Sequence, residues 1–356
     1  MSQDWQLAFV SLQQYIEAHP EIRIERRSII IPENVRTEFY RNFDTVREAF
    51  IRDTLPELLV QAEALSSAYL SAESEMKHSL PIDSVSLPNP LGWFLRNPVE
   101  GLMRELFDPV FDLLKGEIDV TGFAEAVSAK MTDSLTELYQ QGYDKWTALA
   151  LMNVLRCDES LRVVVRRPAE HREWTIIRST KGQEAVPYPE PSSTISFVHF
   201  PENIFVVPDF IAHSPILNGF ISFRSGMHNA VATAINSSDE RQWCPYETPV
   251  YSESHPLFVY TDSNPGNINL VADATRICRP DLIIQTTSLT GASREQSLAR
   301  SVYWQESLCP SLGTVLIGEY LKDTVGEIPN GVQLLETRLE PATLFPIVEI
   351  IKKKIS

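Results

Sequence analysis

Four carboxylates stand beside apolar runs in the last third of the chain, where acid–base or metal chemistry would be carried out by such groups. They are Asp262, Asp273, Asp281 and Glu319. Mg²⁺ prefers a few carboxylates together with water molecules as its ligands. If strand ends bring two or three of these side chains together, they would hold Mg²⁺, and the four residues are therefore the candidate catalytic residues.

A polar loop between two apolar runs is the second candidate site. Leu282–Ile284 is a run of strand formers, Arg294–Leu308 has helical spacing, and Thr314–Ile317 is a second apolar run. The stretch therefore predicts strand, loop, helix and strand. Free N–H groups and the dipole at a helix N-terminus favour an anion. The candidate ligand-binding residues are Thr287, Ser288, Thr290, Gly291, Ser293 and Arg294.

The same loop also has a purely structural interpretation. Ser293 is a good N-cap for the helix expected to begin at Arg294, and Ser and Thr are ordinary capping residues. A connection between a strand and a helix is polar in any case. The sequence leaves the anion site and the plain cap open.

Common catalytic and nucleotide-binding motifs are absent from the sequence. It contains no phosphate-binding loop, dinucleotide fingerprint, nucleophile elbow, zinc-binding H-E-x-x-H or EF-hand pattern. The four cysteines lie at least ~30 residues apart, which predicts buried thiols rather than a disulfide framework. No metal-ligating set of Cys and His is therefore expected, and the cofactor is unknown.

One arrangement in the chain resembles a known family. Helices followed by strands, a Pro-Asp, a strand–helix–strand crossover and a closing helix resemble the restriction-endonuclease-like nuclease fold. The signature of that fold is a Pro-Asp on one strand and an acidic-x-Lys on the next. Pro280-Asp281 and Pro208-Asp209 match its first half, whereas Gln285-Thr286-Thr287 has neither the acid nor the Lys. The resemblance covers at most residues 250–340 and implies a relative that is inactive or rearranged.

The charge and composition of the chain indicate which kinds of partner it is suited to bind. The formal net charge is −16, and an acidic chain is poorly suited to nonspecific nucleic acid, because phosphates are bound by Lys and Arg. No apolar run approaches the ~18 residues of a membrane span. The first residues contain Asp4 and no basic leader, so a cytoplasmic protein is expected.

The first 157 residues predict an all-helical domain. Helices are expected over residues 4–18, over two segments meeting at Pro56, over Asp119–Gln141 with a stop at Gly142, and over Asp144–Arg156. A proline-rich break is expected over Leu80–Asn97. The apolar segment Trp93–Phe111 predicts either a surface that binds a partner or lies on a membrane, or side chains that fill the helical core.

From Cys157 onward the hydrophobic period changes from 3.6 to 2. Short strand candidates bounded by Pro, Gly, Asn and Ser predict a mixed α/β domain over residues 158–356, with a largely antiparallel sheet and one strand–helix–strand crossover. The fold class is therefore α+β, with an all-α N-terminal domain.

Two functions of different class follow. The first is a non-enzymatic interaction or ligand-binding protein, whose partner is a protein or a small anion bound at the loop 286–293. The alternative is a metal-dependent hydrolase related to the nuclease fold, for which alone Mg²⁺ is the implied cofactor.

Overall fold

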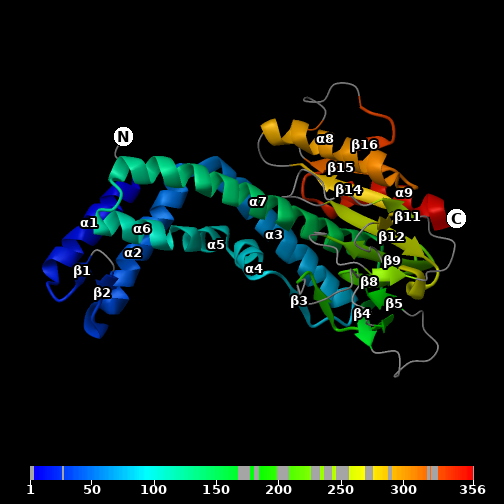
Figure 1. Ribbon diagram of the computed structural model, residues 1–356, viewed down its shortest axis with the longest axis horizontal. Coiled ribbons are helices and arrows are strands. Elements are labelled where there is room, and N and C mark those ends of the chain that lie inside the picture. Colours follow the sequence, from blue (N-terminus) through cyan, green and yellow to red (C-terminus); the bar gives the residue numbers. More distant parts are fainter. Residues whose placement is uncertain are drawn as a thin grey trace. The chain divides into compact units, whose positions relative to one another are not determined.

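The computed structural model describes the chain except for residues 1–3, 26–27, 167–176, 180–183, 199–207, 226–232, 236–242, 246–255, 269–275, 288–290, 319–320, 322–327 and 356. Helices fill the N-terminal half, and a multi-stranded mixed sheet fills the C-terminal half (Figure 1). None of the described helices is both long and apolar enough to cross a bilayer.

The helical half is built from seven α-helices in the described residues, with short strands between some of them. The helices are α1 (Asp4–Ala18), α2 (Glu33–Thr54), α3 (Pro56–Ser79), α4 (Asn89–Arg96), α5 (Pro98–Met103), α6 (Phe107–Lys115) and α7 (Val120–Val154). The short strands are β1 (Arg23–Glu25), β2 (Ser28–Ile30) and β3 (Ser84–Ser86).

The described chain forms two compact units. One contains residues 1–66 and 89–139, and the other contains residues 67–88 and 140–356. The helices α3 and α7 therefore contribute residues to both units. The predicted domain boundary at residue 157 follows the change of secondary structure and stays a prediction.

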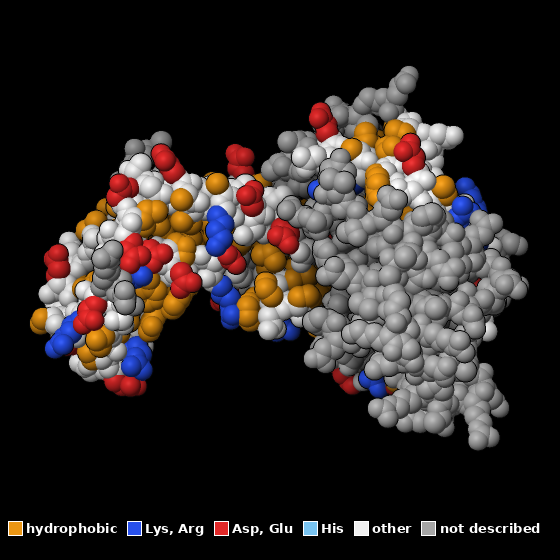
Figure 2. Space-filling model, in the orientation of Figure 1, with side chains coloured by type: hydrophobic (Ala, Val, Ile, Leu, Met, Phe, Trp, Pro, Cys, Tyr) orange, Lys and Arg blue, Asp and Glu red, His pale blue; other side chains and the backbone are white. Residues whose placement is uncertain are grey.

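Aromatic side chains form the core of the first unit. Trp5 is 1% exposed, and its ring lies 5.3 Å from that of Phe50 and 5.5 Å from that of Phe123. Phe39 and Phe43 of α2 are fully buried and stack at 6.0 Å. Rings at these distances add to the stability gained from apolar burial. On the face of this unit seen in Figure 2, acidic and basic side chains are interspersed with hydrophobic ones.

The apolar segment Trp93–Phe111 lies mostly in this core. Phe94, Leu102, Leu106 and Val110 are all fully buried. The Arg104 guanidinium lies 3.0 Å from the centroid of the Trp93 ring, a cation–π contact. Burial of these side chains agrees with the core-filling interpretation of the segment.

Two expected helix boundaries are wrong. The proline-rich stretch holds the helix α4, and α7 continues through Gly142 without the expected stop. A glycine inside a helix costs only about 1 kcal/mol relative to alanine. Beyond Gly142, α7 buries Tyr143, Trp146 and Leu149, and their packing outweighs that cost.

The second unit contains a ten-stranded mixed sheet in the order β10-β5-β6-β4-β8-β9-β12-β14-β15-β16. Its strands are β4 (Glu159–Arg166), β5 (Ile177–Ser179), β6 (Glu184–Pro191), β8 (Phe210–Ser214), β9 (Gly219–Arg224), β10 (Thr233–Ile235), β12 (Leu257–Asp262), β14 (Leu282–Thr286), β15 (Thr314–Gly318) and β16 (Val332–Glu336). Three shorter strands, β7 (Thr194–Ser196), β11 (Trp243–Pro245) and β13 (Arg276–Cys278), pair outside this sheet. The pairs from β10 to β14 are antiparallel, whereas β14, β15 and β16 run parallel.

The strand–helix–strand crossover predicted from the sequence is present. The helix α8 (Gly291–Leu308) connects the parallel strands β14 and β15, and α9 (Phe345–Ile355) closes the chain (Figure 1). The helix α8 begins at Gly291, three residues before the expected start at Arg294. Ser293 is therefore the third residue of α8 and lies inside its first turn, not at the N-cap.

The C-terminal half of α7 and the helix α8 cover opposite faces of the sheet. Trp304 of α8 meets the ring of Phe258 edge-on at 5.4 Å, and Phe258 is paired with Ile283. Thr286 lies three positions after Ile283 on β14, so its side chain points to the other face of the sheet. There its hydroxyl bonds to Asp144 of α7. Because successive side chains of a strand point to opposite faces, the two helices lie on different sides of β14.

Candidate functional site

Buried polar side chains collect along one edge of the sheet in the second unit. The strand β9 ends at Arg224, which is paired with Phe258 at the start of β12, and the neighbouring Leu257 is paired with Ile284 near the end of β14. The end of β9 and the carboxyl end of β14 therefore lie at the same edge. In open α/β sheets, ligands bind outside the carboxyl ends of the parallel strands.

The other parallel strands end at this edge as well. Thr286 is paired with Ile317 of β15, and Gly318 is paired with Glu336 of β16. Thr287 directly follows β14 and donates its backbone N–H to the Ile317 carbonyl at 2.9 Å. A Cβ on Gly318 would overlap the Thr287 hydroxyl, so the glycine makes room for that side chain.

The helix α7 adds polar side chains to the same edge. Gln140 and Asp144 are one helical turn apart and share a face. Gln140 donates to the Thr286 carbonyl at 3.4 Å, and the Thr286 hydroxyl donates to Asp144 Oδ1 at 2.8 Å. The Tyr143 hydroxyl bonds to the hydroxyl of Thr337, which follows β16. One helix thus contacts the ends of two parallel strands.

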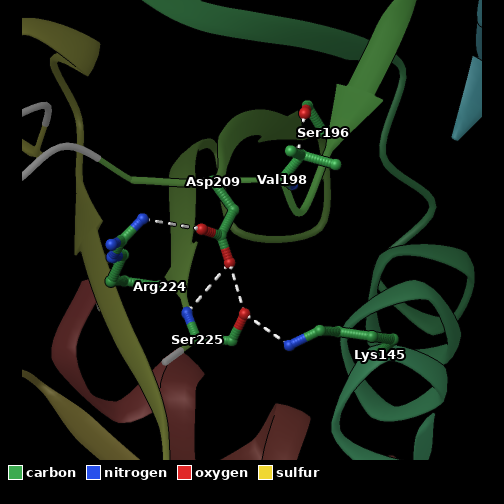
Figure 3. Close-up of polar contacts among 6 residues, drawn as sticks. All are labelled: Lys145, Ser196, Val198, Asp209, Arg224 and Ser225. Atoms are coloured by element: carbon green, nitrogen blue, oxygen red, sulfur yellow. Dashed lines mark hydrogen bonds and ion pairs between the residues drawn. The ribbon is translucent and has the colours of Figure 1, made fainter. Parts of the chain in front are cut away.

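A second group of contacts surrounds Asp209, which directly precedes β8 (Figure 3). Its carboxylate accepts from Arg224 Nη1 at 3.1 Å, from the Ser225 backbone N–H at 2.9 Å and from the Ser225 hydroxyl at 2.7 Å. Lys145 Nζ lies 2.6 Å from Ser225 Oγ. Arg224 and Ser225 follow one another at the end of β9, so the strand itself positions both partners of Asp209.

Burial controls the electrostatics of this edge. It raises the pKa of Asp144 to about 7, against the smaller opposing effects of the Lys145 charge and of the hydrogen bond from Thr286. Burial also lowers the pKa of Lys145, with Arg224 adding to the decrease and Asp209 and Asp144 opposing it. Desolvation disfavours the charged form of any group. Both residues are therefore shifted toward their neutral forms.

One further buried group at this edge lacks a partner. Gln285 is 1% exposed, and its Nε2 donates to the Thr286 carbonyl at 3.2 Å. Its Oε1 has no hydrogen-bond partner within the part of the chain that the structure describes. Buried polar atoms are nearly always hydrogen-bonded, so this atom is an exception at the place where strand β14 meets the predicted ligand-binding loop.

The predicted ligand-binding residues start at this edge. Thr287 is buried beside Gly318, and Gly291 begins α8. Ser293 and Arg294 belong to the first turn of α8, where the structure describes the helix but not their side chains. Ser288 and Thr290 lie outside the described residues. The loop as an anion site stays a prediction.

The predicted carboxylates are only partly described. Asp281 lies at the start of β14, and Asp262 lies at the end of the antiparallel β12. Both are thus at the edge opposite the predicted loop. Asp273 and Glu319 fall outside the described residues, so the convergence of all four is untested. Within the described ranges no three His, Cys, Asp or Glu side chains are grouped to hold a metal ion.

The surroundings of Asp281 are those of a structural residue. It is 3% exposed, and it accepts from the backbone N–H and hydroxyl of Thr261 at 2.6 and 3.0 Å. The Ser311 hydroxyl donates to it at 3.4 Å, and Lys354 of α9 forms an ion pair with it. These contacts connect β12, the segment after α8 and the helix α9 to the start of β14.

Comparisons with protein-family models, with curated proteins and with solved structures gave no match. The site therefore rests on its geometry.

Little in the sequence predicts the residues that meet at this edge. Pro208-Asp209 is distinctive only as a dipeptide, and Lys145 is one charged residue of a predicted amphipathic helix. Ser225 is separated from Lys145 by 80 positions, and Thr286 is separated from Asp144 by 142. One signal was present: Asp144 and Lys145 directly precede the apolar run that starts at Trp146, and two adjacent charges in a buried helical stretch require partners.

Proposed function

We propose that this chain is a ligand-binding protein that takes a small anion at the loop 286–293, beside the carboxyl ends of the parallel strands. One observation carries the proposal. The loop leaves β14 at the sheet edge where Lys145 and Arg224 are buried. The start of an 18-residue helix thus belongs to the edge where these two basic residues are buried, and a helix N-terminus attracts negative charge.

The pKa of Asp144 argues against a cation as the ligand. Burial raises the pKa of its carboxyl to about 7, and a carboxyl group shifted toward its neutral form attracts a cation weakly. Arg224 is buried at the same edge, and a guanidinium group favours a negatively charged ligand.

Binding is tested by thermal unfolding in the presence of inorganic phosphate, sulfate or acetate. A ligand at 100 times its dissociation constant stabilises the native state by about 2.7 kcal/mol. Arg294→Gln should remove most of the shift, because it takes a cation from the first turn of α8. Arg23→Gln changes an exposed arginine of β1, in the other compact unit, and is the matched control. No shift with any of the three anions would contradict the proposal.

The metal-dependent hydrolase remains the alternative function and has no support among the described side chains. Its candidate ligands are two or three of the carboxylates of Asp262, Asp273, Asp281 and Glu319. Of these, the Asp281 carboxylate already accepts three hydrogen bonds and forms an ion pair within the protein. Unfolding in the presence of Mg²⁺ and Mn²⁺ tests it directly. Stabilisation by either ion would favour the hydrolase.

The proposal also includes a cytoplasmic protein of two domains, divided at residue 157. The change from helices to strands at this point supports the division. Limited proteolysis followed by mass spectrometry tests it. Stable fragments ending near residue 157 are expected, whereas cleavage near residues 66, 88 and 139 alone would favour the division into compact units instead.

A further inference from the structure

Lys145 has an unusual environment for a buried lysine. It is 8% exposed, and its one hydrogen bond within the described residues is to the Ser225 hydroxyl. An ammonium group has three N–H donors. Besides this bond, Nζ lies 5.2 Å from the centroid of the Phe197 ring. No described carboxylate forms an ion pair with Lys145, so a charged ammonium here would be poorly compensated.

The neutral amine fits this environment better than the ammonium. A buried charge is costly unless it is paired and hydrogen-bonded. Burial lowers the pKa of Lys145, and the nearby Arg224 lowers it further, whereas Asp209 and Asp144 act in the opposite direction. The carboxylate of Asp209 is itself occupied by Arg224 and Ser225. A neutral amine has a lone pair that accepts a hydrogen bond, and the Ser225 hydroxyl lies within its reach.

Ser225 is held in place from two sides. Asp209 Oδ2 accepts from both its backbone N–H and its hydroxyl, at 2.9 and 2.7 Å, while Lys145 Nζ lies 2.6 Å from the same hydroxyl (Figure 3). In the structure the hydroxyl donates to Asp209, and Lys145 Nζ donates to the hydroxyl. Because a hydroxyl proton rotates between acceptors, we infer that it also reaches the lone pair of Lys145 when the amine is neutral. Serine becomes a nucleophile when an adjacent base within this distance takes its proton.

We propose that Lys145 and Ser225 are the base and the nucleophile of an acyl-transfer site for a carboxylic ester. Ser225 Oγ forms a bond to the ester carbonyl carbon, and its proton passes to Lys145 Nζ. The carbon–oxygen bond to the alcohol then breaks, and the alcohol leaves with that proton. Water then forms a bond to the acyl carbon while its proton passes to the neutral Lys145. The bond from that carbon to Ser225 Oγ breaks, the acid leaves, and Lys145 returns the proton to Ser225 Oγ.

This chemistry goes beyond anion binding but uses the same sheet edge. It rests on the proposed function only because the ester must reach that edge. The anion site and the acyl transfer can therefore be refuted separately. An anion-induced shift without reaction at Ser225 would overturn the acyl transfer, whereas reaction at Ser225 without any anion-induced shift would overturn the anion site.

The direct test is reaction of the full-length protein with an alkyl fluorophosphonate. Ser225 Oγ would attack phosphorus, fluoride would leave, and Lys145 would take the proton. Intact mass is expected to show one adduct, and peptide mapping is expected to place it on Ser225. An unlabelled protein, or an adduct on Lys145 or on another serine, would overturn the assignment.

Variants separate the chemistry from packing. Ser225→Ala should not be labelled, and Lys145→Met should be labelled roughly 100-fold more slowly or worse, the usual loss for a general base. Ser160→Ala is the matched control, because Ser160 is a buried serine of the same sheet, 3% exposed. It should be labelled like the wild type. Thermal unfolding checks that each variant is folded.

The pH profile gives a readout that a purely structural lysine would not affect. The charged and titratable groups around Lys145 are Asp144 on its own helix and Asp209 and Arg224 on the sheet. The wild-type labelling rate should rise with pH as Lys145 loses its proton, below the range of an ordinary lysine. The same profile in wild type and Lys145→Met would overturn the role of Lys145 as the base.

Discussion

Replacing Asp281 with alanine tests whether this residue stabilises the fold at the start of β14 or belongs to a functional site. The substitution removes the acceptor of the Thr261 N–H and hydroxyl, both of which are buried. An unsatisfied buried donor costs about 1–3 kcal/mol. The ion pair with Lys354 adds less, since that lysine side chain is 34% exposed and solvent screens it.

Together these losses give an expected destabilisation of about 3 kcal/mol. For a chain of 356 residues that corresponds to a decrease in Tm of about 4 °C. The assay is urea unfolding followed by fluorescence, with calorimetry for Tm. Asp281→Asn keeps an oxygen that accepts hydrogen bonds from Thr261, so its free energy of unfolding should decrease clearly less.

The matched control for Asp281 is Asp262→Ala on the neighbouring strand. Asp262 is partly exposed, and its described bonds are to Ser263 and to the backbone N–H of Asn264 in the following turn. The free energy of unfolding of Asp262→Ala should lie within about 1 kcal/mol of the wild-type value. If Asp281→Ala also costs less than about 1 kcal/mol, the structural role is refuted, because surface site residues typically have effects of that size.

Three further predictions concern the sheet edge and the surface. Because the pKa of Asp144 is raised from 3.8 to about 7 in the folded protein, the folded state holds more protons between these values. Stability should therefore fall as pH rises across this window, by up to about 1.4 kcal/mol per pH unit. Asp144→Asn should abolish that part of the slope in urea unfolding at several pH values, and an unchanged slope would contradict the assignment. Gly318→Ala should destabilise by about 1–3 kcal/mol, because its Cβ would overlap the Thr287 hydroxyl. In the same unfolding assay Gly266→Ala, whose nearest contact is the Asn264 side chain at 3.2 Å, should cost less; equal losses would refute the steric argument. Finally, the net charge of −16 predicts no tight binding of duplex DNA near physiological salt, and a gel shift at nanomolar protein would disprove it.

Regular periodicity made parts of the fold predictable from sequence. The spacing of Trp5, Phe9, Leu12 and Ile16 predicts the first helix and its apolar face. The helix is present, with the first three of these side chains buried and Ile16 half-buried. The apolar runs on either side of the 286–293 loop correctly predicted a parallel strand–helix–strand unit. Each of these signals lies within a short window, where burial repeats at the period of the element.

Signals that depend on one residue were misleading. Gly142 predicted the end of a helix, yet α7 continues because the following turns are buried. Ser293 predicted an N-cap, yet α8 already begins at Gly291. Propensity at a single position is worth about 1 kcal/mol or less, and packing of neighbouring side chains in the tertiary structure overrides it.

The two ends of β14 show why an acidic residue near a strand is a poor predictor of a site. Asp281, at one end, is surrounded by donors from β12, from the segment after α8 and from α9. At the other end, Lys145 has one acceptor for its amine, and Gln285 Oε1 has no donor in the described part of the chain. Fully satisfied buried groups stabilise a fold, whereas unsatisfied ones cost free energy that a ligand would recover. The edge with the incomplete hydrogen bonding is therefore the stronger candidate site, and sequence alone does not distinguish it, because satisfaction depends on residues 80 or more positions away.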